Sequence, residues 1–311
     1  MDSYPLETSP FYRMSSPHKL AELLFVSKEK LETLANKPDV ERYRFFNVDG
    51  RKVQEPNPQL QVIHKRIYQL LSRIEAPDYL HSARAGRSYL TNARVHIGRN
   101  SIIKADVKRF YPSVTRKSIY GFFRNLLECS SEVAAILSKL TTVDEHLATG
   151  SSASPLLSYY AHKPMFEEIN TLVTDSDCKM TVYVDDITIS GEFVSKKFLS
   201  IIRGIISRHG LKSHKAHYFP VSTPKVVTGV IVQHDKIALP NKRHLKIKQG
   251  FDDLNAAQTI EEKLSILPSL TSRLFEAVQI DKGWLPQAQS LVDLRKKLQR
   301  DLRTKKALAG R

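Results

Sequence analysis

The sequence predicts an α+β domain followed by a helical, basic module. Strand-like and helical segments are mixed between about residues 40 and 235, which is typical of a single α+β domain. Beyond Ile237 no further strand signal occurs, and apolar residues recur at helical spacing. We therefore expect three parts: an N-terminal helical segment over residues 1–40, an α+β domain over 41–235 and a helical module over 236–311.

The composition favours a folded protein that binds a polyanion. The 311 residues include 48 Lys and Arg against 32 Asp and Glu, a formal net charge of +16, and 41% are hydrophobic, so the chain can bury a core. Two cysteines, Cys129 and Cys178, are too few for a disulfide framework or a Cys-rich zinc module. No apolar run approaches the ~18–20 residues that span a membrane. We expect a cytoplasmic protein with no membrane partner, and nucleic acid as the first candidate polyanion.

Capping and turn residues bound the elements of the N-terminal part. Ser16 and Pro17 begin a helix that apolar residues extend to about residue 36. Asp49-Gly50 joins two strand-like stretches as a hairpin turn. The expected elements are a helix over 17–36, strands over 43–48 and 51–53, a helix over 59–74, irregular structure over 76–99 and a short strand over 102–106 that ends on an acid.

Strands and helices continue to alternate downstream, and from Pro240 the chain is helical. Only Asp185-Asp186 separates two of the strands, so we expect this pair at the tip of a hairpin. The expected helices cover 116–127, 131–140, 153–173 and 194–208, and the expected strands cover 181–184, 187–189, 218–219 and 226–232.

Three carboxylates stand out in so basic a chain. Adjacent side chains on a regular strand face opposite ways, so Asp185 and Asp186 approach one site only where the strand turns. Like charges held together cost free energy unless a cation compensates them. Asp106 ends another short strand and supplies a third carboxylate. Oxygen ligands from separate strands suit Mg²⁺, and two such ions can activate a hydroxyl and stabilise a leaving oxygen. The alternative is a solvated turn, because Asp is common in turns.

The residues around these acids favour the metal site. Tyr183-Val184-Asp185-Asp186 resembles the Tyr-x-Asp-Asp signature of reverse transcriptases. Asp106, followed by Phe110-Tyr111-Pro112-Ser113, resembles their first palm motif, and the two motifs stand in the family's order. The resemblance implies a right-hand polymerase fold, with fingers and an antiparallel palm sheet over 41–235 and a helical thumb over 236–311. It also implies that Asp106 and Asp185 bridge two Mg²⁺ ions and that Asp186 is a weaker ligand.

The same resemblance assigns a nucleotide site. Leu147–Pro155 resembles the family's Leu-Pro-Gln-Gly-x-x-x-Ser-Pro loop, which assigns Gly150 and Ser151 to nucleotide binding, although Thr149 replaces the usual Gln. Arg51 and Lys52 stand at the position of a fingers hairpin that can clamp the triphosphate; a solvated basic hairpin is the alternative.

Two further side chains acquire roles from the resemblance. Tyr111 stands where the family keeps an aromatic residue that excludes a 2′-hydroxyl, with a core aromatic as the alternative. His217, downstream of Gly210-Leu211, lies near a family Lys that is a candidate proton donor to pyrophosphate. A surface histidine near phosphates is an equal alternative.

Two short motifs point to the bacterial retron reverse transcriptases. Asn92–His96 resembles their Asn-Ala-x-x-His element, and Val227–Gly229 resembles their Val-Thr-Gly triplet. We expect both motifs, together with the basic C-terminal helices, to bind a structured RNA. The residues assigned to RNA binding are Asn92, His96, Val227, Thr228, Gly229, Arg295 and Lys296.

The retron resemblance implies the substrates and partners. The template is a cognate structured noncoding RNA, dNTPs are the substrates, and a guanosine 2′-hydroxyl of that RNA is the primer, so the single-stranded DNA product is part of a branched RNA–DNA hybrid (msDNA). Such systems serve antiphage defence, in which the polymerase–nucleic-acid complex restrains an effector protein. Two alternatives stay open: a reverse transcriptase of another bacterial retroelement, group II intron-like or diversity-generating, and a non-catalytic basic RNA-binding protein.

Overall fold

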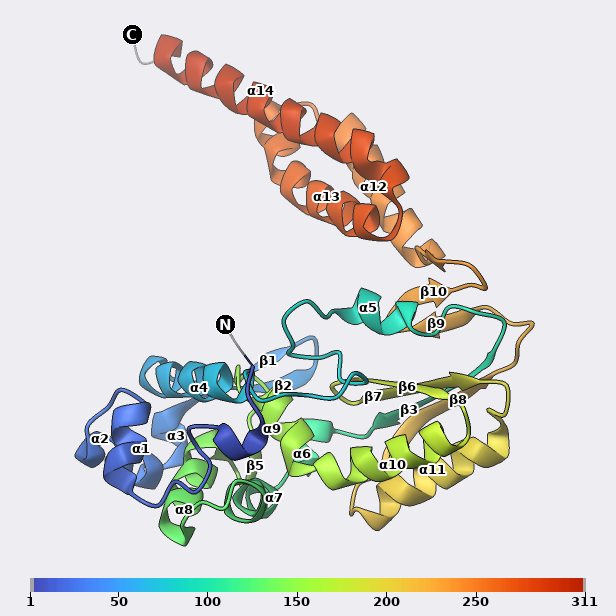
Figure 1. Cartoon of the computed structure of the whole chain (residues 1–311). Helices are drawn as coiled ribbons and strands as arrows, with labels where there is room; N and C mark the ends of the chain where they lie inside the picture. The colour runs from blue at the N-terminus through green and yellow to red at the C-terminus, as the bar shows by residue number, and fades with distance from the viewer. Residues whose placement is uncertain (1–2, 310–311) are drawn as a thin grey trace. The chain divides into compact units, whose positions relative to one another are not determined.

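The computed structural model describes the backbone of residues 3–309 and side chains as far as residue 305. It forms two compact units of helices and antiparallel sheets (Figure 1). One unit runs to His96 and over Asn100–Val221, and the other comprises Ile97–Arg99 and the chain from Ser222 onward. Residue 235, where we expect a boundary, therefore falls inside the second unit. Within the described part of the chain, no helix is both long and apolar enough to cross a lipid bilayer.

The N-terminal helical segment contains several short helices. A 3₁₀ turn, η1 (Leu6–Thr8), precedes α1 (Pro17–Leu23), α2 (Lys28–Asn36) and α3 (Asp39–Arg42). The expected single helix over 17–36 is wrong because Ser27 caps a second start: its side chain accepts a hydrogen bond from Lys30 N. Between the two helices, Phe25 has a φ of +58°, which interrupts the helical backbone.

A β-hairpin follows, as the Asp-Gly turn predicts. In β1 (Tyr43–Val48) and β2 (Arg51–Pro56), Val48 lies opposite Arg51. Asp49 and Gly50 have φ values of +49° and +73°, the backbone of a type I′ turn.

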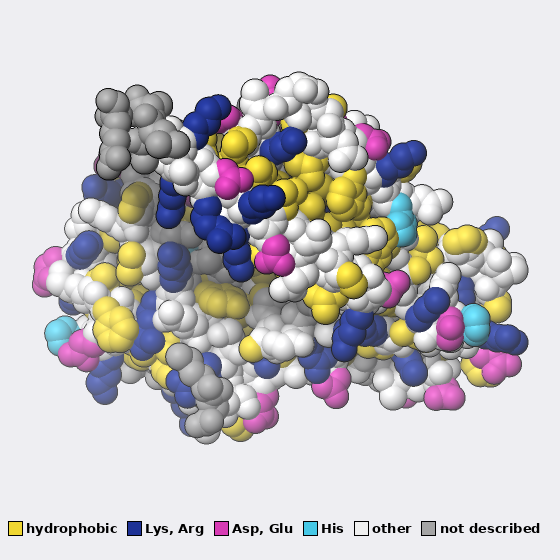
Figure 2. Space-filling view, turned by 90° about the horizontal axis from the view of Figure 1, so that it is seen from above, with side chains coloured by type: hydrophobic (Ala, Val, Ile, Leu, Met, Phe, Trp, Pro, Cys, Tyr) yellow, Lys and Arg dark blue, Asp and Glu magenta, His cyan; other side chains and the backbone are white. Residues whose placement is uncertain are grey.

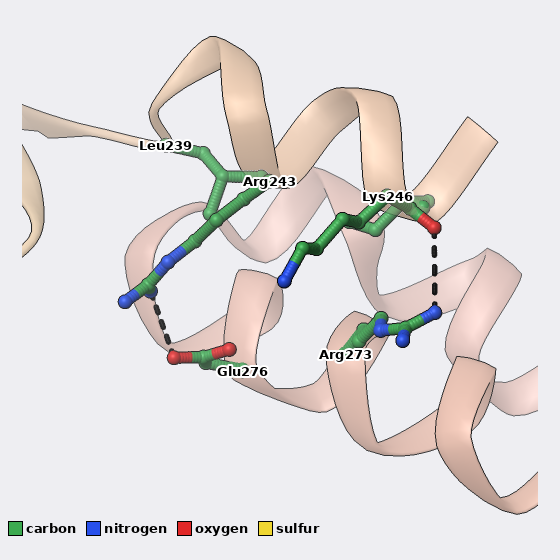
Figure 3. A pocket seen from close by; sticks show the side chains of 6 residues that line it. Leu239, Arg243, Lys246, Arg273 and Glu276 are labelled. Atoms are coloured by element: carbon green, nitrogen blue, oxygen red, sulfur yellow. Dashed lines mark hydrogen bonds and ion pairs between the residues drawn. The ribbon is translucent and has the colours of Figure 1, made fainter. Parts of the chain in front are cut away.

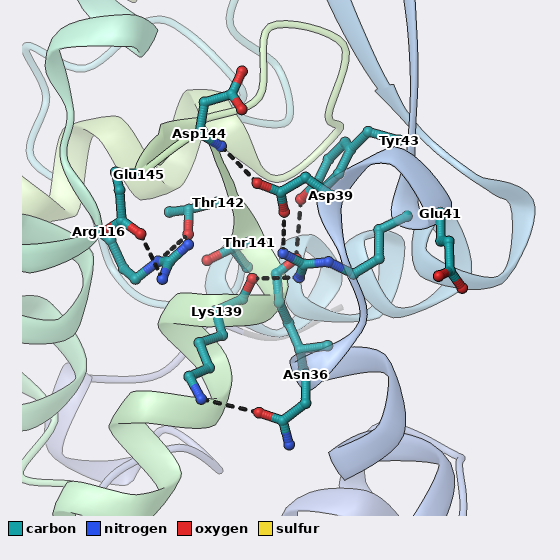
Figure 4. Close-up of polar contacts among 12 residues, drawn as sticks. Asn36, Asp39, Glu41, Tyr43, Arg116, Lys139, Thr141, Thr142, Asp144 and Glu145 are labelled. Carbon is teal, nitrogen blue, oxygen red and sulfur yellow. Dashed lines mark hydrogen bonds and ion pairs between the residues drawn. The ribbon is translucent and has the colours of Figure 1, made fainter.

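Buried polar contacts attach the base of this hairpin to α8 (Ser131–Thr141), as Figure 4 shows. The Arg42 guanidinium is 3% exposed; it donates to Lys139 O at 2.7 Å and to the Asp39 carboxylate. The Tyr43 hydroxyl donates to Leu140 O at 3.1 Å. These contacts fix the start of β1, while most of β1 and the tip of the hairpin remain exposed.

Three expected elements of the first unit change because of local chemistry. The helix over 153–173 divides into α9 (Ser154–Ala161) and α10 (Lys163–Asp175), since Pro164 has no N–H to continue a helix. The helix over 116–127 becomes α7 (Arg116–Gly121) followed by a π-helical turn, η2 (Phe122–Leu126). Residues 76–99 include an unexpected helix, α5 (Tyr89–Arg94). A capping box between Ser88 and Thr91 stabilises its N-terminus.

The remaining elements of the first unit surround one main sheet. They are α4 (Pro58–Leu71), α6 (Phe110–Ser113), the two-stranded pair β4 (Thr142–Val143) and β5 (His146–Leu147), and α11 (Lys196–Arg208). The sheet itself has the order β6-β7-β3-β8, from β3 (Ser101–Val107), β6 (Lys179–Tyr183), β7 (Asp186–Gly191) and β8 (Ser213–Phe219). All neighbouring strands are antiparallel. Helices α10 and α11 cover one face of this sheet (Figure 1).

The second unit combines a small sheet with three helices. Its strands are β9 (Lys225–Val227), β10 (Val230–Val232) and β11 (Ile237–Ala238), and its helices are α12 (Asn241–Ala256), α13 (Ile260–Ile280) and α14 (Leu285–Ala309), with the 3₁₀ turn η3 (Lys282–Trp284). The expected strand over 226–232 is wrong: Thr228 and Gly229, at φ +43° and +78°, form a hairpin turn in its middle. The helices share an apolar core of their own that includes Leu267, Leu270 and Leu274.

Gly191, the last residue of β7, has no room for a side chain. A Cβ there would lie 2.4 Å from Cys178 Sγ and 3.2 Å from Cys178 Cα. We expect Gly191→Ala to lower the free energy of unfolding by about 1–3 kcal/mol because backbone has to shift. Gly121→Ala is the control: its Cβ meets only Asn125 Nδ2 at 3.8 Å, so it should be neutral or stabilising. Urea denaturation followed by circular dichroism measures both, and equal stability of the two variants would contradict the packing argument.

Candidate active site

Antiparallel pairing places the three aspartates at one end of the central sheet. Asp106 is the penultimate residue of β3, Asp186 is the first residue of β7, and the two are direct cross-strand partners. Tyr183 pairs with Asp186 across the β6–β7 hairpin, so the turn residues are Val184 and Asp185. The expectation that Asp185 and Asp186 together form the turn is therefore wrong by one residue. This shift leaves Asp186 on a strand, where its side chain shares a face with Asp106.

The turn that carries Asp185 has a strained backbone. Val184 has a φ of +59°, a region that β-branched residues rarely adopt. Asp185 O accepts a hydrogen bond from Val107 N at 2.9 Å, which attaches the turn to the end of β3. The strain thus accompanies a backbone bond that brings Asp185 beside Asp106.

Burial and mutual repulsion act on these carboxyl groups. Burial raises the pKa of Asp106, and the charge of Asp186 raises it further, while Lys104 acts in the opposite direction. Burial also raises the pKa of Asp185, to which the charges of Asp106 and Asp186 contribute. Asp186 has a partner of its own: Lys104 Nζ lies 2.7 Å from its Oδ2.

A β-bulge in β8 brings two histidines to this face. Lys104 of β3 pairs with His217 of β8, whereas Asp106 pairs with His214. Strand β8 therefore contains one extra residue between these two pairs. Lys215, inside the bulge, has a φ of +45°. His214 therefore lies opposite Asp106, whereas the exposed His217 lies opposite Lys104. The sequence resemblance named His217 as the proton donor; the register places His214 nearer the carboxylates.

A hollow of about 390 Å³ adjoins the turn that carries Asp185. It combines cations of β2, the residues that follow β3 and the loop before α9. Its lining residues are Arg51, Lys52, Val53, Arg109, Phe110, Tyr111, Pro112, Thr149, Val184 and Asp185. The structure thus brings together Arg51, Lys52 and Tyr111, which sequence comparison assigns to one nucleotide site. Its volume is in the range of small-ligand pockets.

The loop before α9 contacts β2 through its backbone. Gly150 N donates to Gln54 O at 2.9 Å, and a Cβ on Gly150 would lie 2.9 Å from the same oxygen, so only glycine fits. Gln54 N donates to Thr149 Oγ1 at 3.0 Å. Thr149 stands at the position of the family's Gln, and its hydroxyl is thus engaged by the backbone of β2.

Ser151 does not line the hollow, contrary to its assignment to nucleotide binding. Its hydroxyl is buried and lies 2.7 Å from His64 Nδ1, while His64 Nε2 donates to Leu140 O at 2.8 Å. Burial lowers the pKa of His64 to about 4, so the ring is neutral and accepts from Ser151. Ser151 and His64 therefore support the loop from inside the core.

The Asn-Ala-x-x-His element is buried in the first unit. His96 is 1% exposed; its Nδ1 lies 2.7 Å from Ser190 Oγ and its Nε2 lies 2.7 Å from Thr181 Oγ1. It thus connects β6 and β7, the strands of the hairpin that carries Asp185. Asn92 is 0% exposed. The assignment of Asn92 and His96 to direct RNA contact is contradicted, because neither side chain reaches the surface.

The other residues assigned to RNA binding lie in the second unit. Thr228 and Gly229 form the β9–β10 turn after Val227, and a Cβ on Gly229 would lie 3.3 Å from Arg243 Nη2 of α12. Arg295 and Lys296 are exposed on α14. Lys and Arg side chains are also spread over the face that Figure 2 shows.

Cations also surround a small pocket between α12 and α13, which sequence reasoning did not single out. Its volume is about 150 Å³, and its lining includes Arg243, Lys246, Arg273 and Glu276. Arg243 pairs with Glu276 at 2.8 Å, and the Lys246 side chain extends into the space between the two arginines (Figure 3). Three cations against one acid leave the pocket positively charged.

The carboxylates fit a divalent cation, although the described residues contain no group of three or more His, Cys, Asp or Glu side chains arranged as metal ligands. Asp106 and Asp185 supply hard oxygen donors, and a cation between them would relieve the repulsion that raises their pKa. Asp186 is engaged by Lys104, so the ready ligand pair is Asp106 and Asp185.

Several curated retron reverse transcriptases are similar to this chain. Retron Se72 reverse transcriptase of Salmonella heidelberg is 27% identical over 75% of this chain and 66% of its own length. Retron Ec86 reverse transcriptase of Escherichia coli is 24% identical over 80% of this chain and 81% of its own length, and retron Ec48 reverse transcriptase of the same species is 25% identical over 79% and 67%. These similarities support a retron-type reverse transcriptase.

The chain was also compared with protein-family models and with solved structures. No protein-family model matches the chain. Among solved structures, telomerase from Candida albicans, in complex with a fragment of telomeric RNA, aligns with a TM-score of 0.46 and 10% identity over 82% of this chain and 60% of that chain.

Buried neutral histidines make the stability of this protein depend on pH. Burial lowers the pKa of His64 and His162 to about 4 and that of His96 to about 3, against about 6.5 in an unfolded chain. Above pH 6.5 these histidines are neutral in both the folded and the unfolded state. Below pH 6.5 the unfolded state binds protons that the folded state does not, so the free energy of unfolding decreases as the pH is lowered. At pH 5 each buried histidine should lower the free energy of unfolding by about 2 kcal/mol.

The raised pKa values of Asp106 and Asp185 act in the opposite direction, so the variant His96→Asn isolates one histidine. Urea denaturation followed by circular dichroism at pH 7 and pH 5 measures the effect. We expect His96→Asn to lose less stability between the two pH values than the parent does. The same loss in both proteins would show that His96 titrates normally.

Proposed function

We propose that the chain is an RNA-directed DNA polymerase that copies part of a cognate structured noncoding RNA into single-stranded DNA. One observation carries the proposal: three carboxylates at adjoining strand ends lie beside a cationic hollow in a retron-type chain. In the retron reaction the primer is a guanosine 2′-hydroxyl of the RNA, and the product is a branched RNA–DNA hybrid. That part of the proposal rests on the resemblance alone.

In this proposal, Asp106 and Asp185 hold two Mg²⁺ ions. The ions supply activation of the primer hydroxyl and stabilisation of the leaving pyrophosphate oxygen. The chain's own residues orient the nucleotide: Arg51 and Lys52 bind its triphosphate, and Tyr111 packs against the sugar and excludes a 2′-hydroxyl. His214 or His217 on β8 donates a proton to pyrophosphate.

The parts of the chain correspond to the layout of a right-handed polymerase. The β1–β2 hairpin and the helices around it serve as fingers, the sheet β6-β7-β3-β8 serves as the palm, and α12, α13 and α14 serve as the thumb. The mixed antiparallel fold supports this correspondence.

We also propose that the second unit binds the RNA. The supporting features are the Val227–Gly229 turn beside Arg243, the cationic pocket of Arg243, Lys246 and Arg273, and the exposed Arg295 and Lys296 on α14. The pocket has a volume of about 150 Å³, and its cations suit a phosphate group. Cations that neutralise phosphates contribute affinity that falls as salt rises.

The retron resemblance extends the proposal to the cell. The complex of this polymerase with its RNA and DNA restrains an effector protein in an antiphage defence system, in the cytoplasm and without a membrane partner. Nucleic acid extracted from cells that carry the native locus tests this identity. A small single-stranded DNA whose mobility shifts after RNase and debranching treatment is expected; its absence together with active primer extension would favour another retroelement.

Removing one catalytic carboxylate should abolish DNA synthesis. We expect Asp185→Asn to reduce Mg²⁺-dependent primer extension on RNA at least about a thousandfold, because several kcal/mol of transition-state stabilisation are lost. Its folding should be unimpaired, since the neutral amide removes a repelled charge. Asp175→Asn, which changes an exposed carboxylate at the end of α10, is the control and should retain activity. Substantial polymerisation by Asp185→Asn would refute the catalytic assignment.

The cationic pocket of the second unit can be tested through salt dependence. We expect Lys246→Ala and Arg273→Ala each to reduce the slope of log affinity against log salt by about 1 for an RNA hairpin, because each removes one phosphate contact. Lys248→Ala is the control, since two positions along α12 a side chain points to the opposite side. Fluorescence anisotropy at several salt concentrations measures the slopes. Equal slopes for the Lys246 and Lys248 variants would exclude a phosphate site in the pocket.

A further inference from the structure

Lys104 lies within the carboxylate site without belonging to any motif of the family resemblance. It stands two residues before Asp106 on β3, so the two side chains share a face of the sheet. Its Nζ lies 2.7 Å from Asp186 Oδ2, and the two side chains are only 16% and 15% exposed. Partial burial strengthens such a charged hydrogen bond compared with one in water.

The second oxygen of Asp186 is also engaged within the protein. Thr188, two residues along β7, donates its hydroxyl to Asp186 Oδ1 at 3.1 Å. Thr188 is also the cross-strand partner of Lys104. Lys104 and Thr188 thus hold the Asp186 carboxylate from β3 and β7 together, and both of its oxygens accept from protein donors.

The other two carboxylates differ from Asp186 in this respect. Asp106 lies between Asp186 and His214 in the sheet, and Asp185 lies on the adjoining turn. The pKa of each is raised, first by burial and then by neighbouring acids. A divalent cation would relieve this repulsion, whereas Lys104 already compensates Asp186.

We propose that Lys104 is a positioning residue that withholds Asp186 from the metal-ligand set, so that Asp106 and Asp185 alone hold the divalent cation in the nucleotide-free enzyme. This inference rests on the proposed function of the site. The Lys104 ammonium substitutes for a cation beside Asp186 and weakens the repulsion among the three clustered acids. It also keeps the metal affinity of the free enzyme low, because a third carboxylate is not available as a ligand.

Removing the ammonium should release Asp186 and strengthen metal binding. Lys104→Met keeps an unbranched side chain, one atom shorter, without the charge. Calorimetric titration of the nucleotide-free protein with Mn²⁺ should give an affinity at least about tenfold higher than that of the parent, equivalent to about 1.4 kcal/mol. Lys104→Arg keeps the charge and should stay within about threefold of the parent. Lys179→Met, at the exposed start of β6 in the same sheet, is the matched control and should leave the affinity unchanged.

A double-mutant cycle separates this role from simple charge repulsion. In the Asp186→Asn background, Lys104→Met should change Mn²⁺ affinity by less than about threefold, because no third carboxylate is left to release. The same tightening in both backgrounds would show that Lys104 acts only as a repelling charge, and no tightening in either would also overturn the proposal. Circular dichroism of each variant verifies folding, and the uncharged Lys104→Leu replaces the methionine variant if that variant unfolds.

Asp106→Asn separates failure of this inference from failure of the proposed function. It should remove Mn²⁺ binding in calorimetry if the carboxylate site is the metal site. Binding that survives Asp106→Asn would contradict the metal site itself. Binding that depends on Asp106 but not on Lys104 would contradict only the role of Lys104.

Discussion

The pairing of β3 with β7 is the constraint on which the rest of the site depends. It sets Asp106 opposite Asp186, and the hydrogen bond from Val107 N to Asp185 O adds the turn to the same end of the sheet. A slip of one residue would turn Asp186 to the opposite face of the sheet from Asp106. The strained φ of Val184 is tolerated where neighbouring structure holds the turn in place.

Charge compensation is the second requirement of this arrangement. A chain of net charge +16 has cations available, and the structure uses them at distinct places: Lys104 beside Asp186, and Arg51 and Lys52 beside the hollow. Each cation lies near a group or position where negative charge is held or expected. Part of the excess positive charge thus compensates acidic groups at the site, and the rest is available on the surface to attract nucleic acid.

Residues within the family-like motifs divide into groups that line the site and groups that support it from behind. Tyr111 and Thr149 line the hollow, whereas His96 and Ser151 are buried and bonded to other side chains. His96 connects Thr181 and Ser190, one on each strand of the hairpin that carries Asp185. A motif in the sequence therefore marks importance to the site without telling whether its side chain is exposed to a ligand.

Local chemistry predicted the Asp49-Gly50 hairpin and the β3 strand that ends near Asp106, because turn residues and apolar runs over a few positions specify them. The grouping of Asp106 with the distant Tyr-x-Asp-Asp segment was predicted from the resemblance of their motifs to a known family. The sequence missed the breaks at Ser27 and Pro164, the Thr228-Gly229 turn and the capping box at Ser88, although each has a local signal. Only the tertiary structure decided the bulge that sets His214 opposite Asp106, the pairing of Lys104 with Asp186 and the burial of His96. Strand register and burial depend on contacts between residues tens of positions apart, which no short window of sequence contains.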